Sequence, residues 1–250
     1  MPTPLTTEVA DRVHRLEHAY VNVYLVEDEG RVLLVDTGLP RAWEHIGLAL
    51  RHLGHRPDDV AAIALTHAHF DHTGTAARAQ ERLGVPIWAH REDFFIAAHP
   101  YRYAHENLRS VYPVRYPGSL GILAAIARAG ALRVRGVQGL TPYTTEGELD
   151  LPGSPRVVFT PGHTFGHVAL HLPGRDAVIS GDALVTLDPY TGHTGPQIVA
   201  GAATADSTQA LASLGRLAAT GASVVLPGHG EPWTAGVASA VELARERGAH

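Results

Sequence analysis

The chain has 250 residues, of which 45% are hydrophobic and 18% charged, and carries a formal net charge of −5 with 17 histidines. This composition is typical of a globular protein that buries a core. Cysteine is absent, which excludes disulfides, thiolate metal sites and cysteine nucleophiles. The sequence lacks a basic run, an apolar stretch long enough for a membrane span and the apolar centre of a signal peptide, so we expect a protein of the cytoplasm.

Hydrophobic periodicity predicts strands that alternate with helices along the chain. In chain order, the predicted elements are strands at 19–27 and 31–36 joined as a hairpin, a helix from about 40 to 53, a strand at 60–65, a helix at 74–83, a strand at 86–89, a helix at 119–129, strands at 156–160, 167–172 and 176–180, a helix at 206–219, a strand at 223–226 and a helix at 235–247. No stretch has the composition of a linker, so we expect a single domain over residues 1–250. The alternation predicts a layered α/β or α+β fold in which helices cover sheets.

The segment from about residue 91 to 140 has a looser pattern and many aromatic side chains, among them Phe94, Tyr101, Tyr103 and Tyr112. Such a composition is unlike that of disordered segments. We expect an insertion that caps the site and lines an apolar pocket, or else a helical extension whose aromatic side chains only pack on the rest of the domain.

Four potential metal ligands, His67, His69, Asp71 and His72, lie within six residues directly after the predicted strand 60–65. Three imidazoles and a carboxylate packed together repel one another when the imidazoles are protonated, and they gain nothing from burial without a cation. His67 and His69 are two residues apart at a strand end, so their side chains point the same way. Neutral imidazole and carboxylate are ligands that suit zinc, iron or manganese. The cluster therefore predicts a metal site.

Together with four further motifs, this segment resembles the metallo-β-lactamase-fold superfamily of metallo-hydrolases, in particular its lactonase and glyoxalase II-like branch. The further motifs occur in the family's order at predicted strand ends: Asp36-Thr37-Gly38, Thr160-Pro161-Gly162-His163-Thr164, Ser180-Gly181-Asp182-Ala183 and Pro227-Gly228-His229-Gly230. The resemblance implies a four-layer αβ/βα sandwich of the metallo-β-lactamase type, with the metal site at the edge where loops of both sheets meet. We expect no C-terminal helical domain of the glyoxalase II kind, because only a short segment follows His229.

Carried over by position, the resemblance implies two divalent metal ions, with zinc in first place and iron or manganese as alternatives. One ion would be bound by His67, His69 and His163 and the other by Asp71, His72 and His229, with Asp182 bridging the two. Asp71 would also be catalytic, by orienting the nucleophile or carrying its proton. Asp36 would accept a hydrogen bond from a ligand histidine, unless it is only a turn residue.

The same resemblance implies a hydrolase in which a metal-bridging hydroxide attacks an ester-like bond. The lack of cysteine excludes the lactamases with a cysteine ligand, and the remaining dinuclear lactamases generally lack a bridging residue such as Asp182. We therefore expect a lactone, a thioester or a carboxylic ester with an apolar part as substrate. Substrate contacts are expected from His193, in the loop after the Asp182 motif, and from Tyr143, with Tyr101 and Tyr103 as alternatives for a hydroxyl that faces the carbonyl.

Three other functions stay open at the level of sequence. A phosphodiesterase would use the same ligands, a persulfide dioxygenase would use a single iron, and a metal-binding protein without turnover would keep the ligands alone. In every case the expected partner is a small molecule, without nucleic acid or membrane. The sequence does not decide the oligomeric state.

Overall fold

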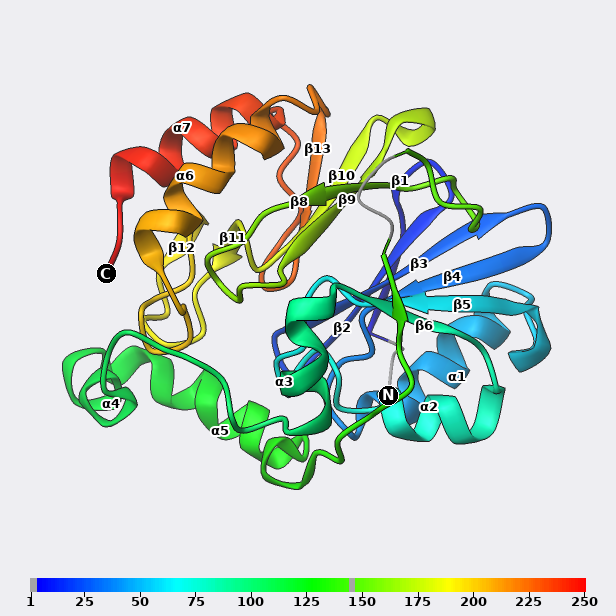
Figure 1. The fold of residues 1–250 in the computed structure, drawn as a ribbon, viewed down its shortest axis with the longest axis horizontal. Helices are drawn as coiled ribbons and strands as arrows, with labels where there is room; N and C mark the ends of the chain where they lie inside the picture. The colour runs from blue at the N-terminus through cyan, green and yellow to red at the C-terminus, as the bar shows by residue number, and fades with distance from the viewer. Residues whose placement is uncertain (1–3, 144–146) are drawn as a thin grey trace.

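Two β-sheets lie face to face in the computed structural model, which describes residues 4–143 and 147–250 (Figure 1). The first sheet has its strands in sequence order: β1 (Leu5–Ala10), β2 (Val13–His18), β3 (Val21–Asp28), β4 (Arg31–Val35), β5 (Val60–Ala64), β6 (Ile87–Ala89) and β7 (Thr141–Pro142). Strands β1 to β4 form an antiparallel meander, and β4 to β7 are parallel.

The second sheet has the order β13-β10-β9-β8, and a separate two-stranded sheet pairs β11 with β12. These strands are β8 (Arg156–Phe159), β9 (Val168–Leu172), β10 (Ala177–Gly181), β11 (Val185–Leu187), β12 (Thr194–Gln197) and β13 (Val224–Pro227). Strand β13 is parallel to β10, whereas β9 is antiparallel to both of its neighbours. The carboxyl ends of β8, β10 and β13 therefore lie at the same edge of this sheet.

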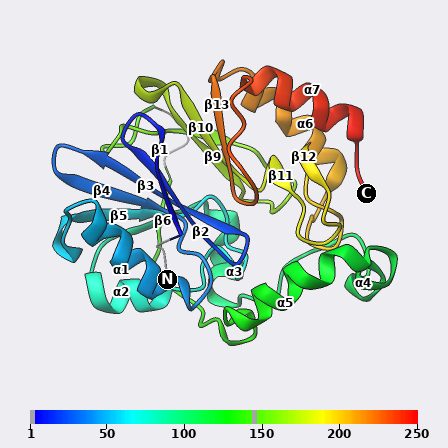
Figure 2. The ribbon, with the colours of Figure 1, turned by 180° about the vertical axis from the view of Figure 1, so that it is seen from behind.

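Helices cover the outer face of each sheet (Figure 2). The first sheet is covered by α1 (Ala42–His52) and α2 (Ala76–Leu83), and the second by α6 (Ser207–Ala218) and α7 (Val237–Arg247). The order of layers is helix, sheet, sheet, helix, which confirms the predicted four-layer αβ/βα sandwich. In the described residues, no helix combines the length and the apolarity that crossing a membrane requires.

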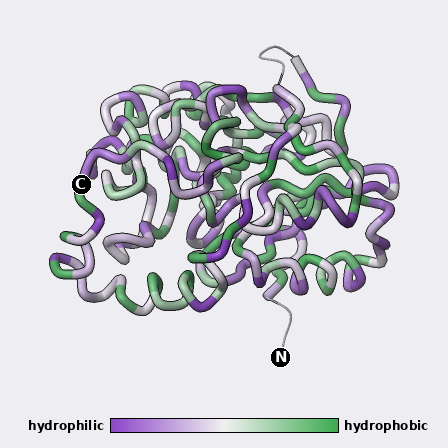
Figure 3. Tube along the Cα trace, turned by 60° about the horizontal axis from the view of Figure 1, so that its bottom comes forward, coloured by the Kyte–Doolittle hydropathy of each residue, from purple (hydrophilic) through white to green (hydrophobic). Residues whose placement is uncertain are grey.

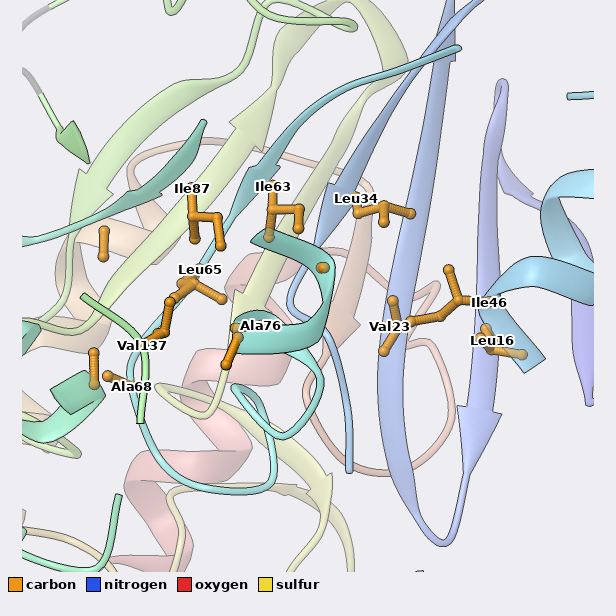
Figure 4. Close-up of a cluster of buried hydrophobic side chains, with 14 of the residues drawn as sticks. Leu16, Val23, Leu34, Ile46, Ile63, Leu65, Ala68, Ala76, Ile87 and Val137 are labelled. Atoms are coloured by element: carbon orange, nitrogen blue, oxygen red, sulfur yellow. The ribbon is translucent and has the colours of Figure 1, made fainter. Parts of the chain in front are cut away.

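Separate hydrophobic clusters fill the spaces between these layers, as the alternation of side chains along each strand dictates. On β4, Leu33 packs between the two sheets, while its neighbour Leu34 packs toward the helices on the outer face. Figure 4 shows Ile46 of α1 beside Leu16 and Val23 of the first sheet in that outer cluster. Burial of each such aliphatic side chain contributes about 1.5–3 kcal/mol to the stability of the folded state.

The segment between β6 and β7 contains α3 (Phe94–Ala98), α4 (Tyr112–Arg115) and α5 (Leu120–Arg128). Figure 3 shows that hydrophobic residues recur along the part that carries α4 and α5, as they do along the central strands. On α5, Ile122 and Ile126 pack against Val21 at the start of β3 and Leu39 after β4. This contact holds α5 beside the edge of the first sheet, near the loops that follow its strands.

The sequence pattern missed the strands β1, β2, β7, β11 and β12. Strand β2 shows the reason: its polar residues are buried, and they bind partners that lie elsewhere in the chain. Arg15 donates to Glu231 Oε1 at 2.8 Å and to the Gly230 carbonyl at 3.0 Å, and His14 Nε2 lies 2.6 Å from Glu27 Oε2. A histidine and an arginine beside Val13 and Leu16 resemble a solvated segment until those partners are known.

Candidate metal centre

The predicted ligands come together because each follows a strand that ends at the same edge of the sandwich. His67 and His69 follow β5, and the turn that leads into α2 places Asp71 and His72. In the second sheet, His163, Asp182 and His229 follow β8, β10 and β13 in the same way. All but Asp71 are buried, and Asp71 is partly exposed.

The ligand atoms form two groups with Asp182 between them. The first group is His67, His69 and His163, and the second contains Asp71, His72 and His229; the ligand atoms of each group lie within 4.8 Å of one another. Asp182 Oδ2 lies 3.4 Å from His163 Nε2 in the first group and 3.3 Å from His229 Nε2 in the second. Asp182 Oδ1 lies 3.5 Å from His72 Nε2. One carboxylate therefore faces both groups, which is the geometry that a bridging ligand requires.

Oxygen atoms behind the histidines fix which ring nitrogen carries the proton. The Thr204 hydroxyl donates to the Val199 carbonyl at 2.7 Å, so its oxygen accepts the proton of His163 Nδ1 at 3.3 Å. His229 Nδ1 lies 2.6 Å from the Tyr20 carbonyl and must donate to it. Both rings therefore turn Nε2 toward the cluster, where it can bind a metal once it carries no proton.

Asp36 orients two further ligands and itself adopts a left-handed backbone conformation, with φ of 60°. Its Oδ2 accepts from His72 Nδ1 at 2.9 Å and from the Thr66 hydroxyl at 2.8 Å, while Oδ1 accepts from the Thr66 amide at 2.8 Å. Since the Thr66 hydroxyl donates to Asp36, its oxygen accepts from His67 Nδ1 at 3.0 Å. Asp36 thus lies behind the predicted ligand histidines and fixes the ring of His72 directly and that of His67 through Thr66.

The donor set fits divalent cations. The buried His67 Nε2, His69 Nε2 and Asp182 Oδ1 have no hydrogen-bond partner among the described residues. Burial, together with the neighbouring His72 and His163, lowers the pKa of His67 well below its usual value. Buried polar atoms without a hydrogen-bond partner cost free energy unless a cation binds them, so these residues fit a metal centre.

Protons and cations compete for the second group. Although burial opposes it, Asp182, Asp71 and Asp36 raise the pKa of His72 to about 9. Against the same effect of burial, His229 and His72 hold the pKa of Asp182 well below its usual range. Both results express the attraction between these carboxylates and the protonated imidazoles, and a metal ion can take the place of the protons.

A small cavity of about 40 Å³ opens onto the cluster. The ring of Tyr103, in the 91–140 segment, lies on the ring of His69, with centroids 4.0 Å apart. The Arg109 guanidinium lies over the Tyr103 ring, 4.3 Å from its centroid. The remaining walls are mostly apolar: Phe70, Leu123, Ile126, Pro189, Tyr190, Val199 and Ala203. The cavity thus joins a polar floor to apolar and aromatic walls.

The structure does not bring His193 or Tyr143 to this cavity, in contrast to the sequence prediction. Tyr143 is buried among the side chains between the sheets, and its hydroxyl donates to the Leu65 carbonyl at 3.0 Å. His193 is exposed, and its ring packs edge to face against Tyr116. Of the alternatives, Tyr103 lines the cavity, whereas the Tyr101 hydroxyl donates to the Ala131 carbonyl at 2.9 Å.

Two further buried residues hold the loops that carry the predicted ligands. His167 Nε2 accepts from the backbone amides of Asp182 and Ala183 at 3.0 and 3.2 Å and so fixes the turn that presents Asp182. Asp93 accepts from the amides of Ala68 and Gly166, at 2.8 and 2.9 Å, and from the Thr164 hydroxyl at 2.8 Å. The short segment around Asp93 carries no motif that would have identified it.

A family model described as the metallo-beta-lactamase superfamily matches residues 17–229, which include both groups of ligands. The chain belongs to this superfamily. Among curated relatives, the chain is 26% identical over 241 residues to the probable metallo-hydrolase YflN of Bacillus subtilis, covering 91% of this chain and 87% of that protein. It is also 26% identical over 188 residues to an N-acyl homoserine lactonase of Bacillus thuringiensis, covering 66% of this chain and 62% of that protein.

Solved structures of the superfamily share the fold. The structure of TTHA1623 in a di-iron-bound form superposes with a TM-score of 0.60 and 30% identity, covering 88% of this chain and 93% of the other. The predicted membership of the superfamily and the predicted fold are therefore confirmed. Most members of this superfamily are hydrolases, and the histidine and aspartate cluster suggests that this chain binds divalent metal.

Proposed function

We propose that this metallo-β-lactamase-fold protein is a dinuclear metal-dependent hydrolase of an ester-like bond: a lactone, a thioester or a carboxylic ester. The observation that carries the proposal is Asp182, whose carboxylate lies between two complete ligand groups at 3.3 Å from His229 and 3.4 Å from His163. Zinc is the metal we propose, and the di-iron structure of TTHA1623 supports a pair of ions in a similar chain. Two such ions would provide a hydroxide from water near neutral pH and polarise the scissile carbonyl.

The protein's own residues supply orientation and a fixed charge pattern. Although burial opposes it, His72 and His229 lower the pKa of Asp71 to about 2, so Asp71 is a carboxylate at neutral pH and a hydrogen-bond acceptor for the attacking water. Burial raises the pKa of Tyr190 to about 12 and that of Tyr103 well above its usual value. Both tyrosines therefore keep their protons in the cavity, where a hydroxyl that donates to the substrate oxygen would stabilise developing negative charge.

The walls of the cavity favour a substrate with an apolar part. Leu123 and Ile126 come from α5, and Tyr103 comes from the same 91–140 segment, which we propose acts as a cap over the metal centre. Phe70 and Val199 complete an apolar rim around the polar floor. An ester or lactone has this division into a polar reacting group and an apolar remainder, and the similarity to a lactonase supports this substrate class.

A substrate panel tests the proposal. The zinc-loaded protein is assayed with a lactone, a thioester, carboxylic esters and a phosphodiester, each with and without a chelator. We expect ester, thioester or lactone turnover that chelation abolishes and zinc restores. Turnover of the phosphodiester alone, oxygen consumption with a persulfide, or no turnover in a protein with both metals bound would each contradict the proposal.

A further inference from the structure

The segment from Asn107 to Leu140 carries charge of one sign only. It contains no aspartate or glutamate, and it has five arginines: Arg109, Arg115, Arg128, Arg133 and Arg135. The whole chain has a net charge of −5, so a segment of +5 leaves −10 on the rest of the sequence. A cationic segment of this length in an acidic protein favours a partner with negative charge.

Apolar side chains protrude from the same segment. The three most exposed large hydrophobic side chains among the described residues are Val114 (84%), Leu132 (80%) and Leu108 (71%), and Leu120 and Val111 are 51% and 50% exposed. Apolar side chains that gather at a surface in this way are typical of an interaction site. We call these five side chains, together with the exposed Arg115, Arg128 and Arg133, the α4–α5 margin.

Helix α5 shows why part of this margin points outward. Ile122 and Ile126, four residues apart, pack inward against the domain, so the opposite side of the helix faces away from it. Leu120, Ala127 and Arg128 lie on that opposite side and are exposed. Figures 1 and 2 show α4 and α5 one after the other along one edge of the molecule.

The positive charge of the margin is not compensated within the part of the chain that the structure describes. Arg135 pairs with Glu81, whereas Arg115, Arg128 and Arg133 form no ion pair with a carboxylate of residues 4–143 or 147–250. Glu106, the acidic residue just before the segment, is directed to α6, where it accepts from the Ser207 amide at 2.8 Å. The guanidinium groups of the margin therefore keep donors for an outside anion, and phosphate is the group that they bind best.

We propose that the α4–α5 margin docks on the surface of a membrane that contains anionic phospholipid. The aliphatic side chains enter the boundary between headgroups and acyl chains, and the arginines bind the lipid phosphates. Val114 and Leu132 protrude at separate points, with small exposed residues such as Gly121 and Ala127 between them. A fluid lipid surface accommodates separate protrusions, whereas a folded partner needs a matching pocket for each.

This docking does not depend on the reaction at the metal centre. It departs from the expectation, drawn from the sequence, of a small molecule as the one partner. The reason is that the exposure of the margin is a property of the fold: Leu120 and Ile122 are similar residues two positions apart, yet only Leu120 is exposed.

Vesicle binding tests the proposal. The zinc-loaded protein is sedimented with sucrose-loaded vesicles of phosphatidylcholine alone, or of phosphatidylcholine and phosphatidylglycerol in equal parts. We expect binding to the anionic vesicles only, and weaker binding as salt is added. Val114→Asp and Leu120→Asp should each lower the partition constant at least about tenfold, because each removes an inserted side chain and adds negative charge. Arg128→Gln should lower it about fivefold.

Two control variants make the same chemical changes elsewhere. Leu243→Asp changes a side chain that is 40% exposed on α7, at the opposite edge of the molecule in Figure 1. Arg31→Gln removes an exposed arginine at the start of β4. Both control variants should bind the anionic vesicles as the wild type does.

Three results would overturn the proposal. The first is a wild type that does not bind the anionic vesicles, or that binds both kinds of vesicle equally. The second is an equal loss of binding in the margin variants and in the controls. The third is a dimer in sedimentation velocity that Val114→Asp dissociates, with no protein on the vesicles, which would assign the margin to a second copy of the chain.

Discussion

Asp93 offers a test of how the metal centre is held, because it joins the two loops that carry the ligands of the first group. Ala68 lies between His67 and His69, and Thr164 follows His163, and both donate to Asp93 Oδ2 at 2.8 Å. The side chain of Asp93 is inaccessible to solvent and contacts no ligand directly. We predict that Asp93→Asn disturbs the relative position of the two loops and weakens zinc binding there.

The magnitude follows from the number of donors. An amide has one oxygen and one NH₂ group, so at least one of the three donors that face Asp93 then meets another donor. Leaving a buried donor without a partner costs about 1–3 kcal/mol, and hydrogen bonds to a charged acceptor contribute about 1.5–3 kcal/mol against about 1 for a neutral one. We expect a loss of about 2–4 kcal/mol in the free energy of unfolding and of about 10–100-fold in zinc affinity.

Urea unfolding of the metal-free protein gives the first quantity, and titration against a chelator of known affinity gives the second. The control is Asp188→Asn, because Asp188 is equally buried and accepts from two backbone amides, at 2.9 and 3.2 Å, in a loop without ligands. It should lose stability and keep its zinc affinity. Wild-type affinity in Asp93→Asn, or an equal loss of affinity in both variants, would refute the role of Asp93.

Four further predictions concern the ligands. Asp182→Ala should lose at least one metal and most activity, and unchanged metal content by mass spectrometry would contradict the bridging position. His69→Ala should lower turnover by orders of magnitude, while His45→Ala, on α1 outside the cluster, should leave it unchanged. Zinc binding at pH 7 should release about two protons, from His72 and His229, because the pKa of both histidines is raised. The zinc affinity should therefore rise with pH up to about 9. Calorimetry in two buffers of different ionisation enthalpy measures the number of protons released. Because the folded-state pKa of His72 is raised, its proton stabilises the metal-free fold below pH 6.5, and that contribution is lost as the pH rises toward 9.

The sequence predicted the layers and the cluster well because both are recorded in short local patterns. The apolar run 60–65 and the histidines after it are adjacent in the chain, so a strand end and a ligand loop can be recognised together. Thr160 to Thr164 and Ser180 to Ala183 work in the same way. Asp36, which accepts from His72, also lies in a motif at a strand end.

The remaining features depend on contacts between distant parts of the chain. Asp93 is one acid in a polar stretch until Ala68 and Gly166 fold against it. The sequence alone does not distinguish Tyr143 from Tyr190. In the fold, the Tyr143 hydroxyl donates to the Leu65 carbonyl between the sheets, whereas Tyr190 lines the cavity. Burial and partner, which decide the role of such residues, are properties of the fold and not of the local sequence.

The most direct test of a dinuclear centre is the metal content of the protein purified without added metal. The ligand groups around His67 and His229, with Asp182 between them, predict about two zinc, iron or manganese ions per chain. Removal of the metal should abolish ester hydrolysis, and its return should restore it. A single iron per chain with the other group of ligands empty, or full hydrolysis in the metal-free protein, would contradict the account.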